Sequence, residues 1–381
     1  ATSGASLATE RWSRPVRIVI STGDVSGDMH GGALVRALRA AAARAGVPLE
    51  VYAVGQSALA DAGAEMLEDN SGTSSIGLWE ALPHALPAYR AQQRVRAFLR
   101  ATPPDAVALI DYPGVNLPFA RWLRECVSTG RARIVYYIPP NEWLLSTART
   151  PALVRDSDRV LCVYPDEAEY YEGAGADVQF VGHPLVDEIK AAGTREQARA
   201  RLGVGASDVV VALVPASRAQ EVRMVLPPLA RTAAKLRARL QAEGARVRVL
   251  VPLATESLRA PLEEALAAEE LGDALLVEPG AARRDVLAAA DLALCKTGSV
   301  NVELALLGVP QVACYKVGAI SAAIARRLLK FDPDSTHISL VNLVLDERVH
   351  PEFVQEACDV SNVDSLVDAA WALLKDKGGA R

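Results

Sequence analysis

A polar turn, Lys296–Ser299, separates an apolar run from a helical pattern, and this order of residues suits an anion-binding site. Asp291–Cys295 before the turn is typical of a buried strand, and apolar residues at helical spacing begin at Val300. The pattern therefore predicts a helix that opens at Gly298 and Ser299. The first N–H groups of a helix have no partner within it and carry its positive dipole end, so together they attract anions. A phosphate-type ligand is expected there.

Glu303 lies one turn into the same predicted helix. A carboxylate at that position can accept hydrogen bonds from vicinal hydroxyls, such as those of a ribose. The alternative is an ordinary strand, turn and helix in which Ser299 caps the helix and Glu303 is solvated. The local pattern leaves both interpretations open.

A second polar turn follows the first expected strand, Val16–Ser21. It contains four glycines and the side chains of Ser26, Asp28 and His30. In a doubly wound sheet, ligands bind outside the carboxyl ends of strands such as this one. The spacing is not G-x-G-x-x-G, so a dinucleotide is not the favoured ligand. Close helix–strand packing would explain the glycines at 31 and 32, but not the density of polar side chains.

Alternating strand and helix patterns run along most of the chain and then start again near residue 209, which predicts an α/β protein with two domains. Strands are expected in the first array at Val16–Ser21, Val51–Val54, Ala106–Ile110, Ile134–Ile138, Val160–Val163 and Val178–Val181. Strands are expected in the second array at Val209–Val214, Val247–Val251, Ala274–Val277, Asp291–Cys295 and Val312–Tyr315. Two Rossmann-like, doubly wound domains facing a cleft fit this order best.

The expected domain limits follow from these arrays. Residues 1–15 form a loose N-terminal segment, 16–188 an N-terminal domain and 189–358 a C-terminal domain. Residues 359–381 contain an amphipathic helix that packs back on the N-terminal domain or on the C-terminal one. The length of 381 residues agrees with two domains, because one core of that size is uncommon.

Composition excludes several classes of protein. The formal net charge of −5 argues against a general nucleic-acid binder, which needs a basic face. The five cysteines contain no C-x-x-C pair, so neither a disulfide framework nor a zinc site is expected. No uncharged apolar run approaches the roughly 18 residues that would span a bilayer. The first 14 residues resemble either a loose terminus or the remainder of an organelle transit peptide.

One stretch interrupts the alternation and has a different character. Apolar residues that include Trp79 and Leu82 precede a row of arginines that includes Arg90 and Arg94. Such a stretch can lie in a membrane interface or hold an acyl chain near an anionic headgroup. The alternative is an inward-facing helix with a solvated basic face.

A set of motifs, taken in order, resembles the lipid-A-disaccharide synthase family, and most closely its cyanobacterial type. These motifs are Ser21–Asp28 (STGDVSGD), Leu109–Asn116 (LIDYPGVN), Tyr136–Trp143 (YYIPPNEW), Phe180–Pro184 (FVGHP), Pro215–Glu221 (PASRAQE), Lys296–Glu303 (KTGSVNVE) and Val341–Leu343 (VNL) with Pro351–Glu352. The resemblance extends from Arg17 to about Cys358. It implies a fold similar to GT-B, an N-terminal domain for the lipid-linked acceptor and a C-terminal domain for the nucleotide sugar.

The resemblance also implies a reaction. An inverting glycosyltransferase of this family transfers 2,3-diacylglucosamine from its UDP derivative to 2,3-diacylglucosamine 1-phosphate, forming a β-1,6 disaccharide and releasing UDP. A cytoplasmic protein, peripheral on the inner face of the membrane, is expected, with a homodimer as one option and a plastid location if the source is eukaryotic. No cofactor is expected, because the UDP-sugar is a substrate.

The resemblance places the essential aspartate of the family at Asp111, as the base that takes the proton of the acceptor hydroxyl. His30 and Asp28 are competing candidates, and a strand-end carboxylate that caps the next turn is the structural alternative for Asp111. Gly114 stands where many bacterial members have a second Asp, so more weight falls on Asp111.

Further site residues are implied for the two substrates. Arg218 is expected to bind the UDP diphosphate, since its planar guanidinium matches phosphate oxygens, although a surface ion pair with Glu221 is the alternative. The expected UDP-binding set is Ser217, Arg218, Thr297, Gly298, Ser299 and Glu303. The expected substrate contacts are Ser26, Gly27, Asn116 and Asn342, where an Asx turn is the alternative for Asn342.

The sequence also bears on metal binding and leaves two alternative functions open. No metal site is expected: Asp156 with Asp158, and Asp332 with Asp334, resemble Asp-x-Asp motifs but fit helix caps or turns better. Another UDP-sugar enzyme of the GT-B class, an epimerase or a transferase with a different acceptor, is an alternative function. A non-catalytic nucleotide-sugar or lipid-binding protein is another, because fold alone does not determine function.

Overall fold

The computed structural model describes residues 14–70, 85–126, 132–145, 147–280, 282–318, 322 and 337–376. The chain divides into two compact units, Ala1–Pro184 and Leu185–Arg381, and each unit is described by itself. The predicted boundary between residues 188 and 189 lies inside helix α9 (Pro184–Ala192), which begins at the last residue of the first unit.

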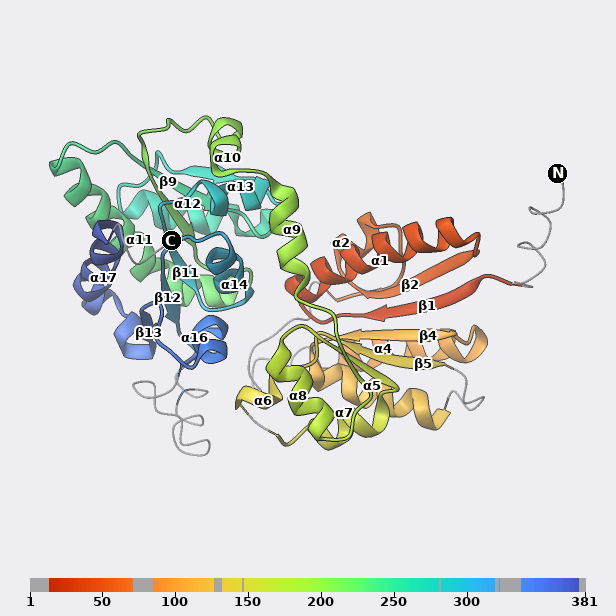
Figure 1. Cartoon of the computed structure of the whole chain (residues 1–381). Coiled ribbons are helices and arrows are strands. Elements are labelled where there is room, and N and C mark those ends of the chain that lie inside the picture. Colours follow the sequence, from red (N-terminus) through yellow and green to blue (C-terminus); the bar gives the residue numbers. More distant parts are fainter. Residues whose placement is uncertain are drawn as a thin grey trace. The chain divides into compact units, whose positions relative to one another are not determined.

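The first unit is built on a parallel sheet whose described strands are arranged in the order β3-β2-β1-β4-β5-β6-β7 (Figure 1). The strands are β1 (Val16–Ser21), β2 (Leu49–Gly55), β3 (Glu65–Asp69), β4 (Ala106–Ile110), β5 (Arg133–Tyr137), β6 (Arg159–Cys162) and β7 (Val178–Phe180). The helices are α1 (Val25–Ala45), α2 (Ser57–Asp61), α4 (Ala85–Ala101), α5 (Pro113–Cys126), α6 (Glu142–Leu145), α7 (Thr150–Asp156) and α8 (Pro165–Gly173).

Successive residues of the first sheet's central strands enter two different cores, because side chains of a strand alternate between its faces. Val19 packs in a core with residues of α4, α5 and α8, whereas Ile20 packs in a core with α1 and α2. A sheet covered by helices on both faces reads as nearly continuous apolar runs, which is the pattern of Val16–Ser21.

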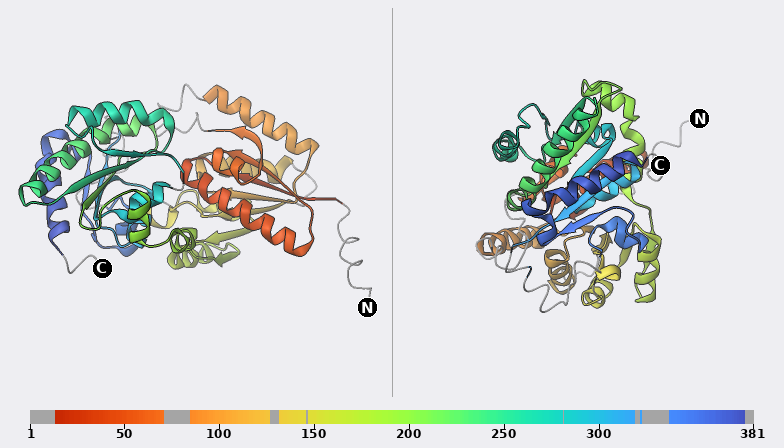
Figure 2. Two further views of the ribbon diagram at one scale, coloured as in Figure 1. Left: turned by 90° about the horizontal axis from the view of Figure 1, so that it is seen from above. Right: turned by 90° about the vertical axis from the view of Figure 1, so that its left-hand side faces the viewer.

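The second unit repeats this design with the strand order β10-β9-β8-β11-β12-β13 (Figures 1 and 2). The strands are β8 (Val209–Val214), β9 (Val247–Pro252), β10 (Leu275–Val277), β11 (Leu292–Lys296), β12 (Gln311–Tyr315) and β13 (Glu352–Val354). The α-helices are α10 (Arg195–Arg201), α11 (Ala219–Ala242), α12 (Arg259–Ala268), α13 (Ala282–Ala289), α14 (Ser299–Leu306), α16 (Leu340–Leu345) and α17 (Val363–Lys375). Short 3-10 turns are η2 (Glu256–Leu258), η3 (Gln355–Cys358) and η4 (Val360–Asn362).

The C-terminal helix α17 belongs to the second unit. Leu366 and Ala370 are fully buried in the same core as Leu229 and Leu236 of α11, and Figure 2 shows the two helices side by side. Of the two placements that the sequence left open, the helix packs on the C-terminal unit. The apolar side of α17 packs in the core of the second unit, which is the nearest one in sequence.

The prediction of two doubly wound domains is confirmed, and all the strands expected from apolar runs are present within one or two residues at each end. The sequence reading missed β3 and β13, which lie at the edges of the two sheets. Strand β3 reads EMLED and β13 reads EFV, so both are too short or too charged to show the apolar pattern of a central strand.

Strand order reverses at one place in each sheet. In the first sheet the reversal lies between β1 and β4, and in the second it lies between β8 and β11. At such a switch point the connections leave in opposite directions, so the carboxyl ends of the two strands border an open crevice where ligands bind. The turns after Ser21, Ile110, Val214 and Lys296 are therefore the places to look for a site.

A buried ion pair fixes the opposite, amino-terminal edge of the second sheet. The guanidinium of Arg199, which is 7% exposed, donates to the Asp291 carboxylate at 2.7 Å and to the carbonyl oxygens of Ala206, Asp208 and Ala289. Asp291 also accepts the N–H of Val210 at 2.8 Å. Removing Arg199 would leave three main-chain carbonyls without this donor, whereas Asp291 is 27% exposed and also pairs with Arg195.

We predict that Arg199→Ala lowers the free energy of unfolding by about 3 kcal/mol, because three carbonyls lose this donor while Asp291 keeps Arg195 and the N–H of Val210. Urea denaturation measures the change. Arg195→Ala is the matched control, since Arg195 pairs with the same Asp291 but is 44% exposed, and it should cost less than about 1 kcal/mol. Equal losses in the two variants would contradict this account of the edge.

Candidate active site

Asp111 directly follows β4 at the switch point of the first sheet, and its backbone is unusual. Asp111 and Tyr112 have φ values of +43° and +49°, a left-handed conformation that is uncommon for residues other than glycine. Asp and Asn tolerate it better than most residues, whereas it is costly for a bulky one such as Tyr. Strained backbone of this kind persists only where the surrounding structure holds it, and it is frequent at functional sites.

Hydrogen bonds to the Asp111 main chain hold this conformation. Its carbonyl oxygen accepts from the Asn116 side-chain amide and from the Tyr136 hydroxyl, each at 2.8 Å. Its N–H donates to the Ile138 carbonyl at 3.1 Å. The orientation of the Asp111 side chain is therefore set by the frame of β4 and β5 and not by a flexible loop.

Asn116 was predicted to contact substrate, and the structure corrects this. It is fully buried, its Oδ1 accepts the Ser21 hydroxyl at 2.8 Å, and its Nδ2 donates to the carbonyls of Ile110 and Asp111. The amide joins the end of β1 to the end of β4. Asn116 thus positions Asp111 and does not face a ligand.

The environment of Asp111 raises the pKa of its carboxyl from 3.8 to about 6. Burial is the main cause, and the negative charge of Asp24 adds to it; the N–H of Tyr112 and the charge of Arg149 act in the opposite direction. A carboxylate with a pKa near 6 is a better proton acceptor than an ordinary one and is still ionised at neutral pH. The chemistry that fits is general base catalysis.

The loop after β1 lies directly against this turn. A Cβ placed on Gly23 would come within 1.9–2.5 Å of the Tyr112 ring, so only glycine fits at this position. Asp24 follows it and caps helix α1, accepting the N–H of Gly27 at 2.7 Å. The two loops that border the crevice are therefore packed on each other.

Asp28, the first competing candidate for the base, has a structural role. It is 2% exposed, and its two carboxylate oxygens accept the N–H groups of Gln56 at 2.6 Å and Ala58 at 2.7 Å. It thereby satisfies the start of helix α2. Burial raises its pKa, and both oxygens accept main-chain N–H groups, so Asp28 has a structural role and its assignment as base stays a prediction.

His30, the second candidate, lies in helix α1 and is 6% exposed. The centre of its ring lies 5.8 Å from that of the His183 ring, which it meets edge-on. The centre of the His183 ring lies 5.5 Å from that of the Tyr164 ring. His30 stays a candidate for the base. It belongs to a cluster of aromatic rings and not to a glycine loop, because α1 already begins at Val25.

The predicted substrate contacts Ser26 and Gly27 lie in the first turn of α1. Ser26 is partly buried and keeps its candidacy. Gly27 is buried, its N–H is bound by Asp24, and a Cβ there would meet the Asp24 carboxylate at 3.2 Å. Gly27 is thus a close-packing position, as are Gly31 and Gly32, which approach Leu59 and Ala58 of α2.

The sequence reading missed Glu167 and Arg149 as neighbours of Asp111. Glu167 is fully buried, and burial raises the pKa of its carboxyl to about 7; it accepts the N–H of Val163 at 2.8 Å, and the Asp111 charge raises its pKa further. Arg149 is 57% exposed and approaches Glu142 at 3.7 Å. Neither residue shows a signal in the sequence beyond its place after a strand.

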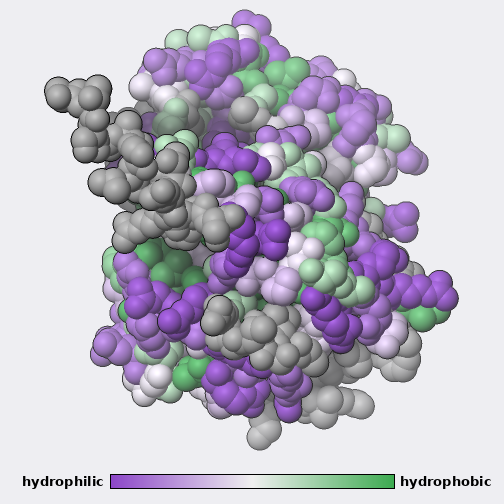
Figure 3. All heavy atoms as spheres, turned by 90° about the vertical axis from the view of Figure 1, so that its right-hand side faces the viewer, coloured by the Kyte–Doolittle hydropathy of each residue, from purple (hydrophilic) through white to green (hydrophobic). Residues whose placement is uncertain are grey.

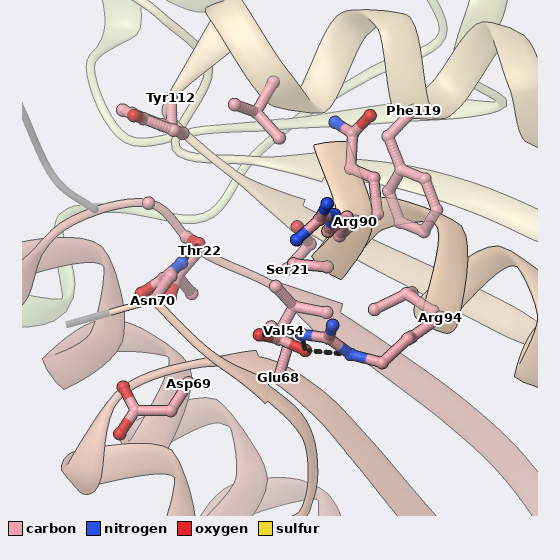
Figure 4. A pocket seen from close by; sticks show the side chains of 15 residues that line it. Ser21, Thr22, Val54, Glu68, Asp69, Asn70, Arg90, Arg94, Tyr112 and Phe119 are labelled. Carbon is pink, nitrogen blue, oxygen red and sulfur yellow. Dashed lines mark hydrogen bonds and ion pairs between the residues drawn. The ribbon is translucent and has the colours of Figure 1, made fainter. Parts of the chain in front are cut away.

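A pocket of about 390 Å³ opens in the first unit beside the Asp111 turn (Figure 4). The carboxyl ends of β1, β2 and β3 form one side, and helices α4 and α5 contribute Val95, Val115 and Phe119. Arg90 and Arg94 of α4 reach into it, and Arg94 pairs with Glu68 at 2.7 Å. A mainly apolar pocket with two arginines suits an apolar chain attached to an anionic group.

Helix α4 combines both interpretations of the Ile76–Arg100 stretch. Val95 and Leu99 are buried in the core, as an inward-facing helix requires. Its first turn, however, exposes Leu86 by 57% and Tyr89 by 58% next to Arg90. Trp79 and Leu82 lie outside the described residues.

On the face shown in Figure 3 most residues are hydrophilic, and the hydrophobic ones gather in small patches. Among the helices of the described residues, none is long and apolar enough to cross a membrane.

In the second unit the switch point between β8 and β11 brings two cations together around one buried carboxylate. Glu221 of α11 is 3% exposed; its Oε1 lies 2.8 Å from Lys296 Nζ and 3.7 Å from an Arg218 guanidinium nitrogen. Arg218 therefore makes the predicted pair with Glu221, but at the crevice and not on an open surface. Ser217 precedes it and is partly buried.

The turn after β11 is confirmed as a strand-to-helix turn, although two of its predicted ligand groups are engaged within the protein. The Thr297 hydroxyl and N–H both bond to the Cys314 carbonyl, and the Gly298 N–H donates to the Asn301 side chain at 2.7 Å. Ser299 is exposed at the first position of α14. Of the predicted anion-binding groups in this turn and after β8, Ser299 and Arg218 stay candidates.

Glu303 was predicted either to bind a ribose or to be solvated, and it is not solvated. It is 4% exposed, and its two oxygens each accept an N–H of Arg283 at 2.8 Å. The paired geometry fixes the plane of the carboxylate and leaves each oxygen with a further lone pair. The ribose contact stays a prediction, and a ribose bound there would share the Glu303 carboxylate with Arg283.

Asn342 was predicted to contact a substrate or to form an Asx turn, and the structure shows a different role, since its side chain binds the main chain at residues 349 and 350. It is fully buried, its Nδ2 donates to the His350 carbonyl at 2.9 Å, and its Oδ1 accepts the N–H groups of Val349 and His350. The side chain closes the loop that follows α16. The substrate assignment is therefore corrected.

Comparison with known proteins agrees with this architecture. The family model described as lipid-A-disaccharide synthetase matches residues 18–377. The lipid-A-disaccharide synthase of Prochlorococcus marinus (strain MIT 9313) is 45% identical over 365 residues, 95% of this chain and 90% of that protein. The protein of the same name from Synechocystis sp. (strain ATCC 27184 / PCC 6803 / Kazusa) is 40% identical over 351 residues, 91% and 86% respectively.

Among solved structures, the UDP-GlcNAc 2-epimerase of Methanocaldococcus jannaschii, in complex with UDP-GlcNAc and UDP, has a similar fold. Its TM-score is 0.57 at 13% identity, and the match covers 96% of this chain and 94% of that one. The likeness shows that both chains share the GT-B type of two Rossmann-like domains.

The raised pKa of Asp111 predicts a pH-dependent stability. Its carboxyl favours the folded state most below its unfolded pKa of 3.8, and this contribution is lost as the pH rises through about 6. Asp111→Asn removes the dependence and keeps a residue that tolerates positive φ.

Between pH 5 and pH 8 the free energy of unfolding of Asp111→Asn should therefore rise by about 1.4 kcal/mol relative to the unsubstituted protein. Denaturant titrations at the two pH values measure this difference. A difference that does not change with pH would show that Asp111 has an ordinary pKa.

Proposed function

The chain belongs to the lipid-A-disaccharide synthetase family, and we propose that it joins two acylated glucosamines with inversion. The donor is UDP-2,3-diacylglucosamine, the acceptor is 2,3-diacylglucosamine 1-phosphate, and the products are a β-1,6-linked disaccharide and UDP. The observation that carries the proposal is the Asp111 carboxylate. It stands at the switch point of the first sheet on a strained, firmly held turn, with a pKa of about 6.

The reaction assigns one task to each unit. The 6-hydroxyl oxygen of the acceptor attacks the anomeric carbon of the donor, its proton passes to Asp111, and the bond between the anomeric carbon and UDP breaks with the electron pair leaving on UDP. Arg218 and the N-terminus of α14 stabilise the charge that develops on the diphosphate. These groups supply the positive charge that the leaving group needs, so we propose that no metal or other cofactor takes part.

The pocket beside Asp111 supports a lipid-linked acceptor. Its apolar wall of Val95, Val115 and Phe119 fits an acyl chain, and Arg90 and Arg94 fit the 1-phosphate. The exposed Leu86 and Tyr89 next to Arg90 fit the interface of an anionic bilayer. The protein is therefore proposed to act peripherally on the cytoplasmic face of a membrane that holds both substrates.

Transfer itself tests the proposal. Incubation with the UDP-diacylglucosamine donor and the diacylglucosamine 1-phosphate acceptor should give the disaccharide, identified by mass spectrometry. Absence of any disaccharide with active, UDP-binding protein would refute the function.

Asp111→Asn should reduce kcat by about 100- to 10,000-fold and leave UDP affinity unchanged, because it removes the base but not the donor site. In the unsubstituted protein, kcat should fall below pH 6 as Asp111 becomes protonated. Asp28→Asn is the comparison for stability, since Asp28 caps α2: it should destabilise the fold without the same selective loss of kcat. Retention of kcat in Asp111→Asn would remove Asp111 as the base.

The acyl pocket can be tested by filling it. Ala91→Trp places bulk on the lining of the pocket and should raise KM for the long-chain acceptor by about tenfold, since each buried CH₂ group contributes about 0.8 kcal/mol. Ala97→Trp is the matched control, because Ala97 is exposed on the same helix and does not line the pocket. Equal KM values in the two variants would place the acyl chain elsewhere.

A further inference from the structure

Three neighbouring strands of the second sheet end around the Glu221 carboxylate. Arg218 follows β8, Lys296 ends β11 and Tyr315 ends β12, and these strands are adjacent in the order β8-β11-β12. Lys296 Nζ lies 2.8 Å from Glu221 Oε1 and 5.8 Å from the centre of the Tyr315 ring. The cluster lies at the switch point, beside the N-terminus of α14.

The two cations differ from their shared carboxylate in exposure. The side chain of Glu221 is 4% exposed, whereas those of Lys296 and Arg218 are 19% and 25% exposed. The carboxylate thus lies beneath two positive groups that reach toward the crevice. Both positive groups lie next to the positive end of a helix, and this arrangement favours an anion.

Lys296 Nζ lies 2.8 Å from the Glu221 oxygen as an ion pair, and its ammonium group has three N–H donors that an anion can accept. A lysine held in this way is directed by its carboxylate partner and still has donors for an anion. Arg218 at 3.7 Å is held by the same oxygen, so both cations are oriented by one group. An anion with several oxygens, and not a single carboxylate, matches two cations that converge from adjacent strands.

We propose that Lys296 is a second phosphate-binding residue of this unit, acting with Arg218 on the diphosphate of a nucleoside diphosphate, and that Glu221 is the residue that positions both. The inference rests on the proposed function, because the UDP-sugar donor supplies that diphosphate. It adds Lys296 to the residues expected to bind UDP, which in the Lys296–Ser299 turn were Thr297, Gly298 and Ser299.

The test compares ligands that differ only in their phosphates. UDP, UMP and uridine are titrated calorimetrically into Lys296→Met, which keeps the length of the side chain and removes its charge. UDP affinity should fall about 10- to 100-fold, the range for a charged hydrogen bond, and uridine affinity should stay unchanged. Lys235→Met is the matched control, because Lys235 of α11 likewise pairs with a carboxylate, that of Asp364. The Lys235→Met protein should bind all three ligands with unchanged affinity.

Lys296→Met leaves Glu221 buried without its closest partner and can therefore unfold, so a second comparison is needed. Lys296→Met with Glu221→Gln removes both charges and is compared with Glu221→Gln alone. A further loss of UDP affinity of about tenfold or more in the double variant supports phosphate binding by Lys296. Equal UDP affinity in the two variants means that Lys296 only neutralises Glu221, which overturns the proposal.

Failure of the proposed function has a different signature. If the unsubstituted protein binds UDP no better than uridine, there is no diphosphate site, and the proposed donor is wrong along with this inference. If the unsubstituted protein discriminates between UDP and uridine and both lysine comparisons keep that discrimination, the donor site stands and Lys296 alone is misassigned.

Discussion

The buried amide of Asn116 is the interaction on which the geometry of the first unit depends. It joins Ser21 at the end of β1 to Ile110 and Asp111 at the end of β4, across the point where the strand order reverses. The second unit uses the same device: Asn301 is fully buried in α14, accepts the Gly298 N–H and bonds to Gln311 of β12. Asn116 lies five residues after Asp111, the first residue of its turn, and Asn301 lies five residues after Lys296, the last residue of β11. Each asparagine holds the turn that carries the functional groups.

Most of the fold could be predicted because its physical cause is local. Central parallel strands are buried on both faces, so they read as continuous apolar runs, and Val16–Ser21 and Val209–Val214 were predicted with the limits they have in the structure. The turn after β11 was predicted as a candidate site by the same reasoning, because it comes directly after such a run, whereas Asp111 was assigned as the base through the family resemblance. The edge strands β3 and β13 lack this cause, and they were missed.

Side-chain roles were harder to predict, because a residue type does not reveal its partner. Asp28, Asn116 and Asn342 are polar residues in polar motifs, and each is consumed by main-chain groups distant in sequence or across a loop. Glu303 was expected to meet a ribose or water and instead meets Arg283, which comes from the preceding helix. The raised pKa of Asp111 and the sharing of Glu221 by two cations depend on burial and on distances across strands, which no spacing in the sequence encodes.

The contact of the Tyr112 ring with Gly23 has a consequence for the orientation of Asp111. The ring fills the space that a side chain at residue 23 would need, so the loop after β1 and the turn after β4 interlock. The loop and the turn are therefore packed together as one body at the ends of the two central strands. Because Asn116 and Tyr136 also hold the Asp111 carbonyl, a larger residue at position 23 would disturb the same frame that orients the acid.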